Sequence, residues 1–114
     1  MISTIADANR ILDELVMMLD KAYWEANSVN AKDAIYDCSS TISKELLELS
    51  KLSIQDHDLL YEPISYEFKS MTNRLPIFRK NLDEYIVRNA TLESLDGLIS
   101  STIQLITQET AASS

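Results

Sequence analysis

The stretch that decides the fold is ISYEFKSMTNRLPIFRKNLDEY, residues 64–85. Its apolar residues alternate spacings of four and three, which keeps them on one side of a helix. They are Ile64, Phe68, Met71, Leu75, Phe78, Leu82 and Tyr85. Pro76 lies within this series, where a proline should remove a backbone hydrogen bond and clash with the preceding turn. Because the apolar spacing continues in phase on both sides, the stretch predicts one long helix that is kinked near Pro76.

The alternative is a true break between Asn73 and Pro76. Asn73 is a suitable cap for a new helix, and proline is tolerated in a first turn. A break of this kind would give five helices instead of four. The continuous register favours the kink.

Three further helices are predicted around this stretch. The first begins near Thr4, where Thr4 and Asp7 have the spacing of a capping box. The second is capped by Asn30, the long third helix runs from about Leu59 to Asn89, and Thr91 caps a fourth. Because the connections are short, neighbouring helices should pack antiparallel. The sequence therefore predicts an all-α fold, an antiparallel up-down four-helix bundle with a long third helix kinked or broken near Pro76.

Each of the other three helices has an apolar stripe at helical spacing. The stripes are Ile5, Ala8, Leu12, Leu15, Leu19, Ala22 and Ala26 in the first helix; Ile35, Cys38, Ile42, Leu46, Leu49 and Leu52 in the second; and Leu92, Leu95, Ile99, Thr102 and Ile106 in the fourth. These helices predict one bundle domain over residues 1–108. The small polar residues 109–114 are expected to be a frayed tail.

The predicted third helix is longer than its neighbours. At 1.5 Å per residue it would run about 46 Å, against roughly 33 Å for each of the first two helices. The surplus must be covered by a fold-back at the kink or by a second subunit. This mismatch predicts a possible homodimer.

Composition excludes several classes of protein. The chain has 114 residues, 46% of them hydrophobic, with one glycine and two prolines. So few turn residues argue against an all-β fold, and a single glycine rules out the glycine-rich loops that cradle phosphates. The single cysteine, Cys38, is expected to be a small buried hydrophobe, which suits a reducing compartment. With no apolar run long enough to span a membrane and no signal-peptide pattern, the chain is expected to be cytoplasmic.

The net charge of −8 bears on the partners. A strongly acidic surface disfavours nucleic acid and anionic membranes, since phosphate contacts need clustered cations. The exception is a cationic stretch between residues 69 and 88. Its bases are Lys69, Arg74, Arg79, Lys80 and Arg88. They are interpreted as a solvated face, with docking onto an acidic partner, including another copy of this chain, as the alternative.

The only histidine lies in Asp56-His57-Asp58, with Glu62 about one turn further on. Three carboxylates around an imidazole could hold a divalent metal. The favoured interpretation is a solvated connection in which Asp56 or Asp58 caps the third helix.

Two pairs of carboxylates, Glu45-x-x-Glu48 and Glu93-x-x-Asp96, resemble the magnesium-binding motifs of all-helical nucleotide pyrophosphatases of the MazG type. The resemblance implies a metal-dependent nucleotide pyrophosphohydrolase whose four carboxylates converge on a cation that prefers oxygen ligands. The interval between the motifs is longer here than in that family. The alternative is ordinary surface pairing, such as Glu48 with Lys51.

Two exposed positions are candidates for contact with another molecule. By its helical phase Trp24 should lean outward at the end of the first helix, beside Tyr23 in the core. An exposed tryptophan can anchor an interface, and packing at the edge of the core is the alternative. Gly97 falls on the polar side of the fourth helix, where it could permit close approach of a partner backbone or could reflect simple sequence drift.

The favoured hypothesis is a protein–protein interaction module, a regulator, adaptor or chaperone-like subunit that binds a protein partner or itself. Its general look is similar to that of small acidic helical secretion and flagellar chaperones. The chain is not expected to be an enzyme, and no catalytic, cofactor-binding or metal-binding residue is assigned. The MazG-like hydrolase is the alternative.

Overall fold

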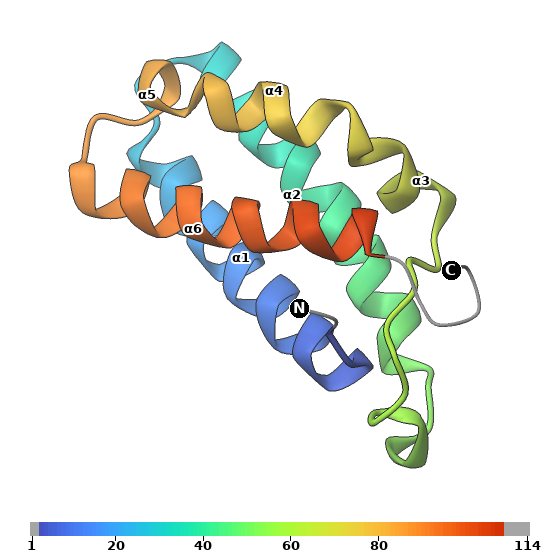
Figure 1. The fold of residues 1–114 in the computed structure, drawn as a ribbon. Helices are drawn as coiled ribbons and strands as arrows, with labels where there is room; N and C mark the ends of the chain where they lie inside the picture. Colours follow the sequence, from blue (N-terminus) through green and yellow to red (C-terminus); the bar gives the residue numbers. More distant parts are fainter. Residues whose placement is uncertain (1–2, 109–114) are drawn as a thin grey trace.

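The computed structural model describes residues 3–108, and they form an all-helical chain (Figure 1). The α-helices are α1 (Ile5–Glu25), α2 (Val29–Ser50), α3 (Tyr66–Lys69), α4 (Arg74–Lys80), α5 (Leu82–Tyr85) and α6 (Asn89–Thr107), and the 3₁₀ turns are η1 (Ile54–Asp56) and η2 (Ser70–Thr72). No strand occurs between residues 3 and 108, where the only pairing of this type is an isolated bridge between Thr4 and Leu60. The all-helical class is confirmed.

Helix α1 begins as the sequence predicts. The Thr4 hydroxyl accepts a hydrogen bond from the backbone N–H of Asp7, and the Asp7 carboxylate accepts one from the backbone N–H of Thr4. These two bonds form a complete capping box and satisfy donors that would otherwise lack partners. The predicted stripe is buried from Ile5 through Ala22.

Helix α2 begins two residues earlier than predicted. Its N-cap is Ser28, whose hydroxyl accepts from the backbone N–H of Ala31, so the prediction of Asn30 as the cap is wrong. Ser28 and Asn30 are both good capping residues, and the sequence alone did not separate them. The inner face of α2 is buried as predicted at Ile35, Cys38, Ile42 and Leu49, with one polar addition, Glu45.

The predicted start of the third helix near Leu59 is wrong. Residues 60–64 are not helical, and Leu60 instead forms the bridge to Thr4. Pro63 gives the physical reason, because the residue before a proline is disfavoured in the helical region. Helix α3 begins only at Tyr66, where the hydroxyl of Ser65 caps it by accepting from the N–H of Phe68. Ile64, assigned to the stripe, lies outside the helix and is 39% exposed.

From Tyr66 to Tyr85 the chain is helical but divided into α3, η2, α4 and α5. The apolar register survives these divisions. Phe68, Met71, Leu75 and Leu82 are buried, and Phe78 and Tyr85 pack against the core. Between α3 and α4 the phase persists because Lys69, Ser70 and Asn73 keep right-handed helical dihedral angles. Asn81, between α4 and α5, departs from these angles with φ −97° and ψ 6°.

Pro76 is the third residue of α4. The backbone N–H groups of a first turn have no partner within their own helix, so a proline there removes no intrahelical bond. Asn73 precedes α4 without making a side-chain capping bond. A new helical segment, α4, therefore begins just before Pro76, as the alternative of a break between Asn73 and Pro76 required. The apolar spacing nevertheless stays in phase across this break, which was the reason for favouring a kink.

The shorter third segment removes the geometric argument for a dimer. Residues 3–108 measure 42 × 26 × 24 Å, and the longest of these dimensions is less than the roughly 46 Å expected for the third helix alone. The stretch from Tyr66 to Tyr85 is close in length to the 21-residue α1. No surplus helix is left for a second subunit to cover.

Helix α6 begins at Asn89 with Arg88 at the N-cap position, so the prediction that Thr91 caps it is wrong. Thr91 lies inside the first turn and is buried, and its hydroxyl donates to a carboxylate oxygen of Glu25 on α1 at 2.8 Å. Leu95, Ile99 and Thr102 are buried as predicted. The expected frayed tail at 109–114 lies outside the described residues.

The core is enclosed by α1, α2, α6 and the helical segments between Tyr66 and Tyr85. Helix α1 packs against α2 and α6, and the segments between Tyr66 and Tyr85 pack against the same two helices. In Figure 1, α6 runs obliquely across α1, and α4 lies above α6, on the side away from α1. The up-down four-helix bundle stays a prediction. Within residues 3–108, no helix has both the length and the apolar character needed to cross a membrane.

Candidate protein-binding surface

The carboxylate of Glu45 is committed to the interior of the protein. Glu45 is fully buried and accepts hydrogen bonds from the Tyr61 hydroxyl at 2.5 Å, the Ile64 N–H at 2.9 Å and the Ser65 N–H at 2.8 Å. The three donors satisfy a group that would be costly to bury alone. Burial, and then the neighbouring Glu45, raise the pKa of Tyr61 far above its ordinary value. Glu45 therefore holds the loop before α3 onto α2.

The other three carboxylates of the MazG-like motifs do not join Glu45. Glu48 pairs with Lys51 at 3.0 Å, the surface pairing that the sequence offered as the alternative. The Asp96 carboxylate accepts two hydrogen bonds from the guanidinium of Arg79, at 2.7 and 3.2 Å. Glu93 lies on the exposed side of α6. Among residues 3–108, no group of three or more His, Cys, Asp and Glu side chains is placed to hold a metal ion.

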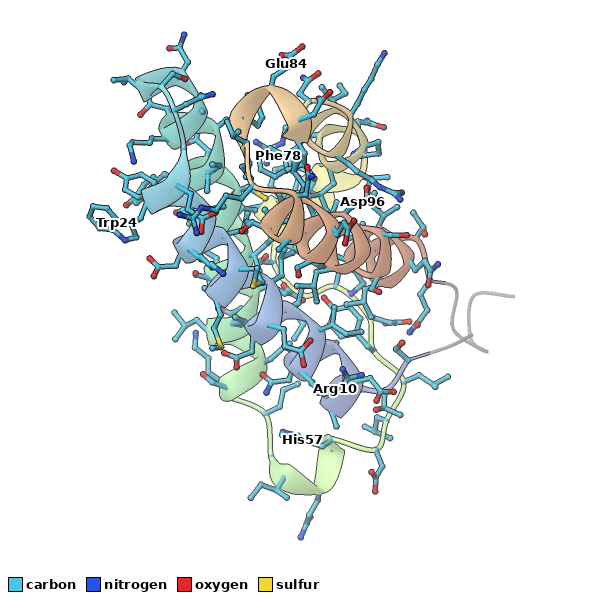
Figure 2. The ribbon with its side chains drawn as sticks, turned by 90° about the vertical axis from the view of Figure 1, so that its left-hand side faces the viewer. Arg10, Trp24, His57, Phe78, Glu84 and Asp96 are labelled. Atoms are coloured by element: carbon cyan, nitrogen blue, oxygen red, sulfur yellow. The ribbon has the colours of Figure 1, made fainter. Side chains whose placement is uncertain are left out.

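His57 contributes to the structure through its backbone carbonyl group. The carbonyl oxygen of His57 accepts from the N–H of Ala6 at 3.0 Å and so helps fix the loop to the start of α1. His57 is half-buried and lies at the loop end of the molecule (Figure 2). The prediction that Asp56 or Asp58 caps the third helix is wrong, because Ser65 does so.

The cationic residues from Lys69 to Arg88 are all exposed, as expected of a solvated face. Arg79 forms its two bonds with Asp96 across α4 and α6, and the Arg74 guanidinium donates to the Ser70 hydroxyl at 3.5 Å. This pairing lowers the pKa of Asp96 and raises the pKa of Arg79. Lys80 lines a groove together with Arg79, and Arg74 lines a different groove beside Cys38 and Phe78.

The structure places two small residues, Cys38, which is buried as predicted, and Gly97. Cys38 is buried, and desolvation raises its thiol pKa to about 12 despite the opposing charge of Arg74. A thiol in this state is a poor nucleophile. Gly97 has open space around the position of a side chain, with no atom of residues 3–108 close by. Its lack of a side chain is not required by packing within the described chain.

The feature that stands out is an apolar outer face on α1 and α2. We define the outer face by five exposed large apolar side chains, Met17, Trp24, Val29, Tyr36 and Leu47. Trp24 is 73% exposed and Tyr36 is 65% exposed, so the outward position predicted for Trp24 is confirmed. Figure 2 shows Trp24 projecting away from the helices at one edge of the molecule.

Helical phase explains how the outer face forms. Met17 and Trp24 are seven residues apart on α1, as are Val29 and Tyr36 on α2, and such pairs lie on one side of a helix. The core takes the opposite sides of both helices. The same α1–α2 hairpin that builds the interior therefore presents a second, outward apolar stripe.

Contacts at the base of the hairpin hold Trp24 in place. The rings of Tyr23 and Trp24 meet edge to face, with centroids 5.3 Å apart. The Lys32 ammonium lies 4.6 Å from the Tyr23 centroid and 5.6 Å from the Trp24 centroid, and it also donates to the Tyr23 carbonyl at 2.5 Å. Cation–π attraction and this capping bond link the end of α1 to the start of α2.

Grooves flank the α1 part of the outer face on both sides. The first, of about 320 Å³, runs between α1 and α2. Its lining is Leu19, Asp20, Tyr23, Trp24, Ile35, Tyr36 and Ser39. The second, of about 430 Å³, lies between α1 and α6 and is lined by Glu14, Met17, Met18, Ser94 and Leu98. The side chains of α1 between the two grooves form a ridge, and another helix could pack its own side chains into the grooves on either side.

Sequence reasoning found Trp24 but missed its companions on α2. The signal was present, because Val29, Tyr36 and Leu47 recur on one helical side opposite the apolar stripe. That pattern is hard to distinguish from single exposed apolar residues, which are common on protein surfaces. The exposed apolar residues of α2 form a candidate surface only together with those of α1, since Tyr36 and Trp24 line the same groove.

Comparison of the chain with family models, with curated proteins and with solved structures found no match.

Proposed function

We propose that this protein is a small helical interaction module that binds another protein through the outer face of α1 and α2. The observation that carries the proposal is that Trp24 and Tyr36 line one groove between α1 and α2, while Met17, Val29 and Leu47 are exposed on the same two helices. Exposed apolar side chains that gather in this way are typical of interaction sites, whereas scattered ones need no explanation. Aromatic anchors at such sites carry much of the binding energy.

The energetic scale is consistent with a specific complex. Covering the exposed parts of Trp24 and Tyr36 would contribute on the order of 3 kcal/mol each at about 25 cal/mol per Å². Association itself costs an estimated 4 kcal/mol or more. Two aromatic anchors thus roughly offset that cost, and the flanking residues must supply the rest.

The proposal includes a finer description of the fold and the setting. We interpret the segments from Tyr66 to Tyr85 as one divided third helix that completes an up-down four-helix bundle. Their packing against both α2 and α6, the neighbours of α1, supports this interpretation. A bundle of this kind would hold the outer face rigid without using it for the core. The free, buried Cys38 is consistent with a cytoplasmic location.

The test is isolation of a partner with matched variants. We expect a stoichiometric protein partner to co-purify with the wild-type chain and to be lost with the double variant Trp24→Ala/Tyr36→Ala. The control is Ile54→Ala/Val87→Ala, which removes two exposed apolar side chains from other parts of the surface. Equal partner recovery with both double variants, or no stoichiometric partner with the wild type, would contradict the proposal. Circular dichroism establishes that each variant is folded.

A further inference from the structure

We infer that the outer face of α1 and α2 receives a cationic amphipathic helix from a different protein. This inference rests on the proposed function and adds the chemical class of the partner. It is carried by the shape of the groove between α1 and α2 and by the charges that surround it.

The shape favours a helix as the occupant. The groove lies between two helices joined by a short turn at residues 26–28, and its walls are side chains about one turn apart on each helix. Trp24 and Tyr36 stand on its two sides, with Leu19 and Ile35 at its base. An amphipathic helix places side chains at i, i+3, i+4 and i+7 into a groove of this kind. An extended strand has no exposed sheet edge to pair with in residues 3–108.

The charges favour a cationic partner. Helix α1 carries five acidic and two basic residues, and α2 carries four and two. With the buried Glu45 set aside, the two helices present a net charge of −4. Four exposed aspartates make no ion pair within residues 3–108, and they flank the apolar stripes. They are Asp13, Asp20, Asp33 and Asp37.

The basic residues of the hairpin offset these acids only in part. Arg10 is already paired with Glu14, whereas Lys21 and Lys44 are exposed and make no ion pair within residues 3–108. Lys32 is held over the rings of Tyr23 and Trp24. Lysine or arginine residues flanking the apolar side of a partner helix would meet the aspartates, which raises the association rate and sets the orientation.

A second copy of this chain fits the same face less well. A twofold dimer through the outer face would place the −4 surface against itself, and like charges across an interface are unfavourable. The cationic stretch of another copy could neutralise it only head to tail, an arrangement that closes into rings or grows into filaments. Arg79 in that stretch is also engaged with Asp96.

The experiment uses two helical peptides with the same apolar stripe and opposite flanking charges. Each has about 18 residues, long enough for a helix, and contains no tryptophan. One carries lysine and arginine beside the stripe, and the other carries glutamate and aspartate. Binding to the full chain is followed by the fluorescence of Trp24, the only tryptophan, and by calorimetry. We expect the cationic peptide to bind at least about tenfold more tightly and to weaken as salt is raised.

Charge reversal on the protein supplies the matched test. The variant Asp20→Lys/Asp37→Lys should favour the acidic peptide, whereas Asp56→Lys/Asp58→Lys, away from the outer face, should leave the preference for the cationic peptide unchanged. Equal binding of the two peptides to the wild type would overturn the cationic partner and leave apolar docking intact. Failure of both peptides to bind would overturn the helical partner. The proposed function fails separately, if Trp24→Ala/Tyr36→Ala retains its co-purifying protein.

Discussion

The Glu45 carboxylate on α2 and the Tyr61 hydroxyl in the loop before α3 meet at 2.5 Å, with both side chains completely buried. Two backbone N–H groups, of Ile64 and Ser65, complete the contacts of that carboxylate. Glu45 thereby ends the extended stretch and positions the N-terminus of α3. Glu45, which the MazG resemblance suggested as a metal ligand, is instead a buried residue that holds two segments of the chain together.

Tyr61→Phe tests this relationship directly. The variant keeps the ring but removes the hydroxyl, which is one of the two donors to Oε2 of Glu45; the Ile64 N–H remains as the other. We expect the free energy of unfolding to fall by about 1–3 kcal/mol, because a buried carboxylate loses one of its three hydrogen bonds. Tyr66→Phe is the control, since Tyr66 is 80% exposed and should change stability by less than about 0.5 kcal/mol. Chemical denaturation measures both variants, and equal losses would contradict the role of Glu45.

Gln108, at the C-terminal end of α6, makes a comparable set of hydrogen bonds between distant parts of the chain. Its side-chain amide donates to the carbonyl oxygens of Ser3 and Tyr61, and its side-chain oxygen accepts from the N–H of Ser3. Gln108→Ala should lower stability by about 1–2 kcal/mol and speed amide exchange at Tyr61. Gln104→Ala, on the exposed side of the same helix, is the matched control. Unchanged exchange at Tyr61 in the Gln108 variant would count against this connection.

Pro76 offers a test of how the third segment is built. Because Pro76 lies in the first turn of α4, Pro76→Ala restores no missing intrahelical bond, and stability should change by less than about 1 kcal/mol. Ile77→Pro, one residue further into α4, should cost about 3 kcal/mol, since its N–H belongs to the helical ladder. Thermal unfolding compares the two. A large gain in stability with Pro76→Ala would indicate that the proline interrupts a continuous helix.

Much of this fold could be predicted from residue spacing. The stripes of α1 and α6 and the register from Phe68 to Tyr85 follow from helical periodicity, and the capping box at Thr4 follows from local chemistry. The extended stretch before α3 was missed because its stability depends on distant partners, Glu45 and the start of α1. Pro63 and Ser65 were the local signals for it.

The candidate surface was harder to predict than the core. Trp24 could be assigned to the exterior from its phase on α1. Its grouping with Tyr36 depends on how α1 and α2 pack, which periodicity on one helix does not specify. The separation of Glu45 from Asp96 likewise depends on tertiary contacts, each made with a residue far away in the sequence.

The thiol of Cys38 should be nearly inert in the folded protein. With a pKa of about 12, almost none of it is thiolate at pH 8, so a disulfide reagent should react far more slowly than in denaturant. The raised pKa favours the folded state only while the unfolded thiol is also protonated. Stability should therefore decline between about pH 9 and pH 12, and Cys38→Ser should decline less over that range. Rapid labelling of the native protein at pH 8 would contradict this.

The most direct test of the central claim is photo-crosslinking from two exposed tyrosine positions. A benzophenone amino acid replaces Tyr36 on the outer face in one variant and Tyr66 at the start of α3 in the other. Both side chains are exposed, so the two probes differ chiefly in location. We expect a discrete adduct with one partner protein from position 36 and none from position 66. No adduct from position 36, or the same adduct in equal yield from both positions, would contradict an interaction surface on α1 and α2.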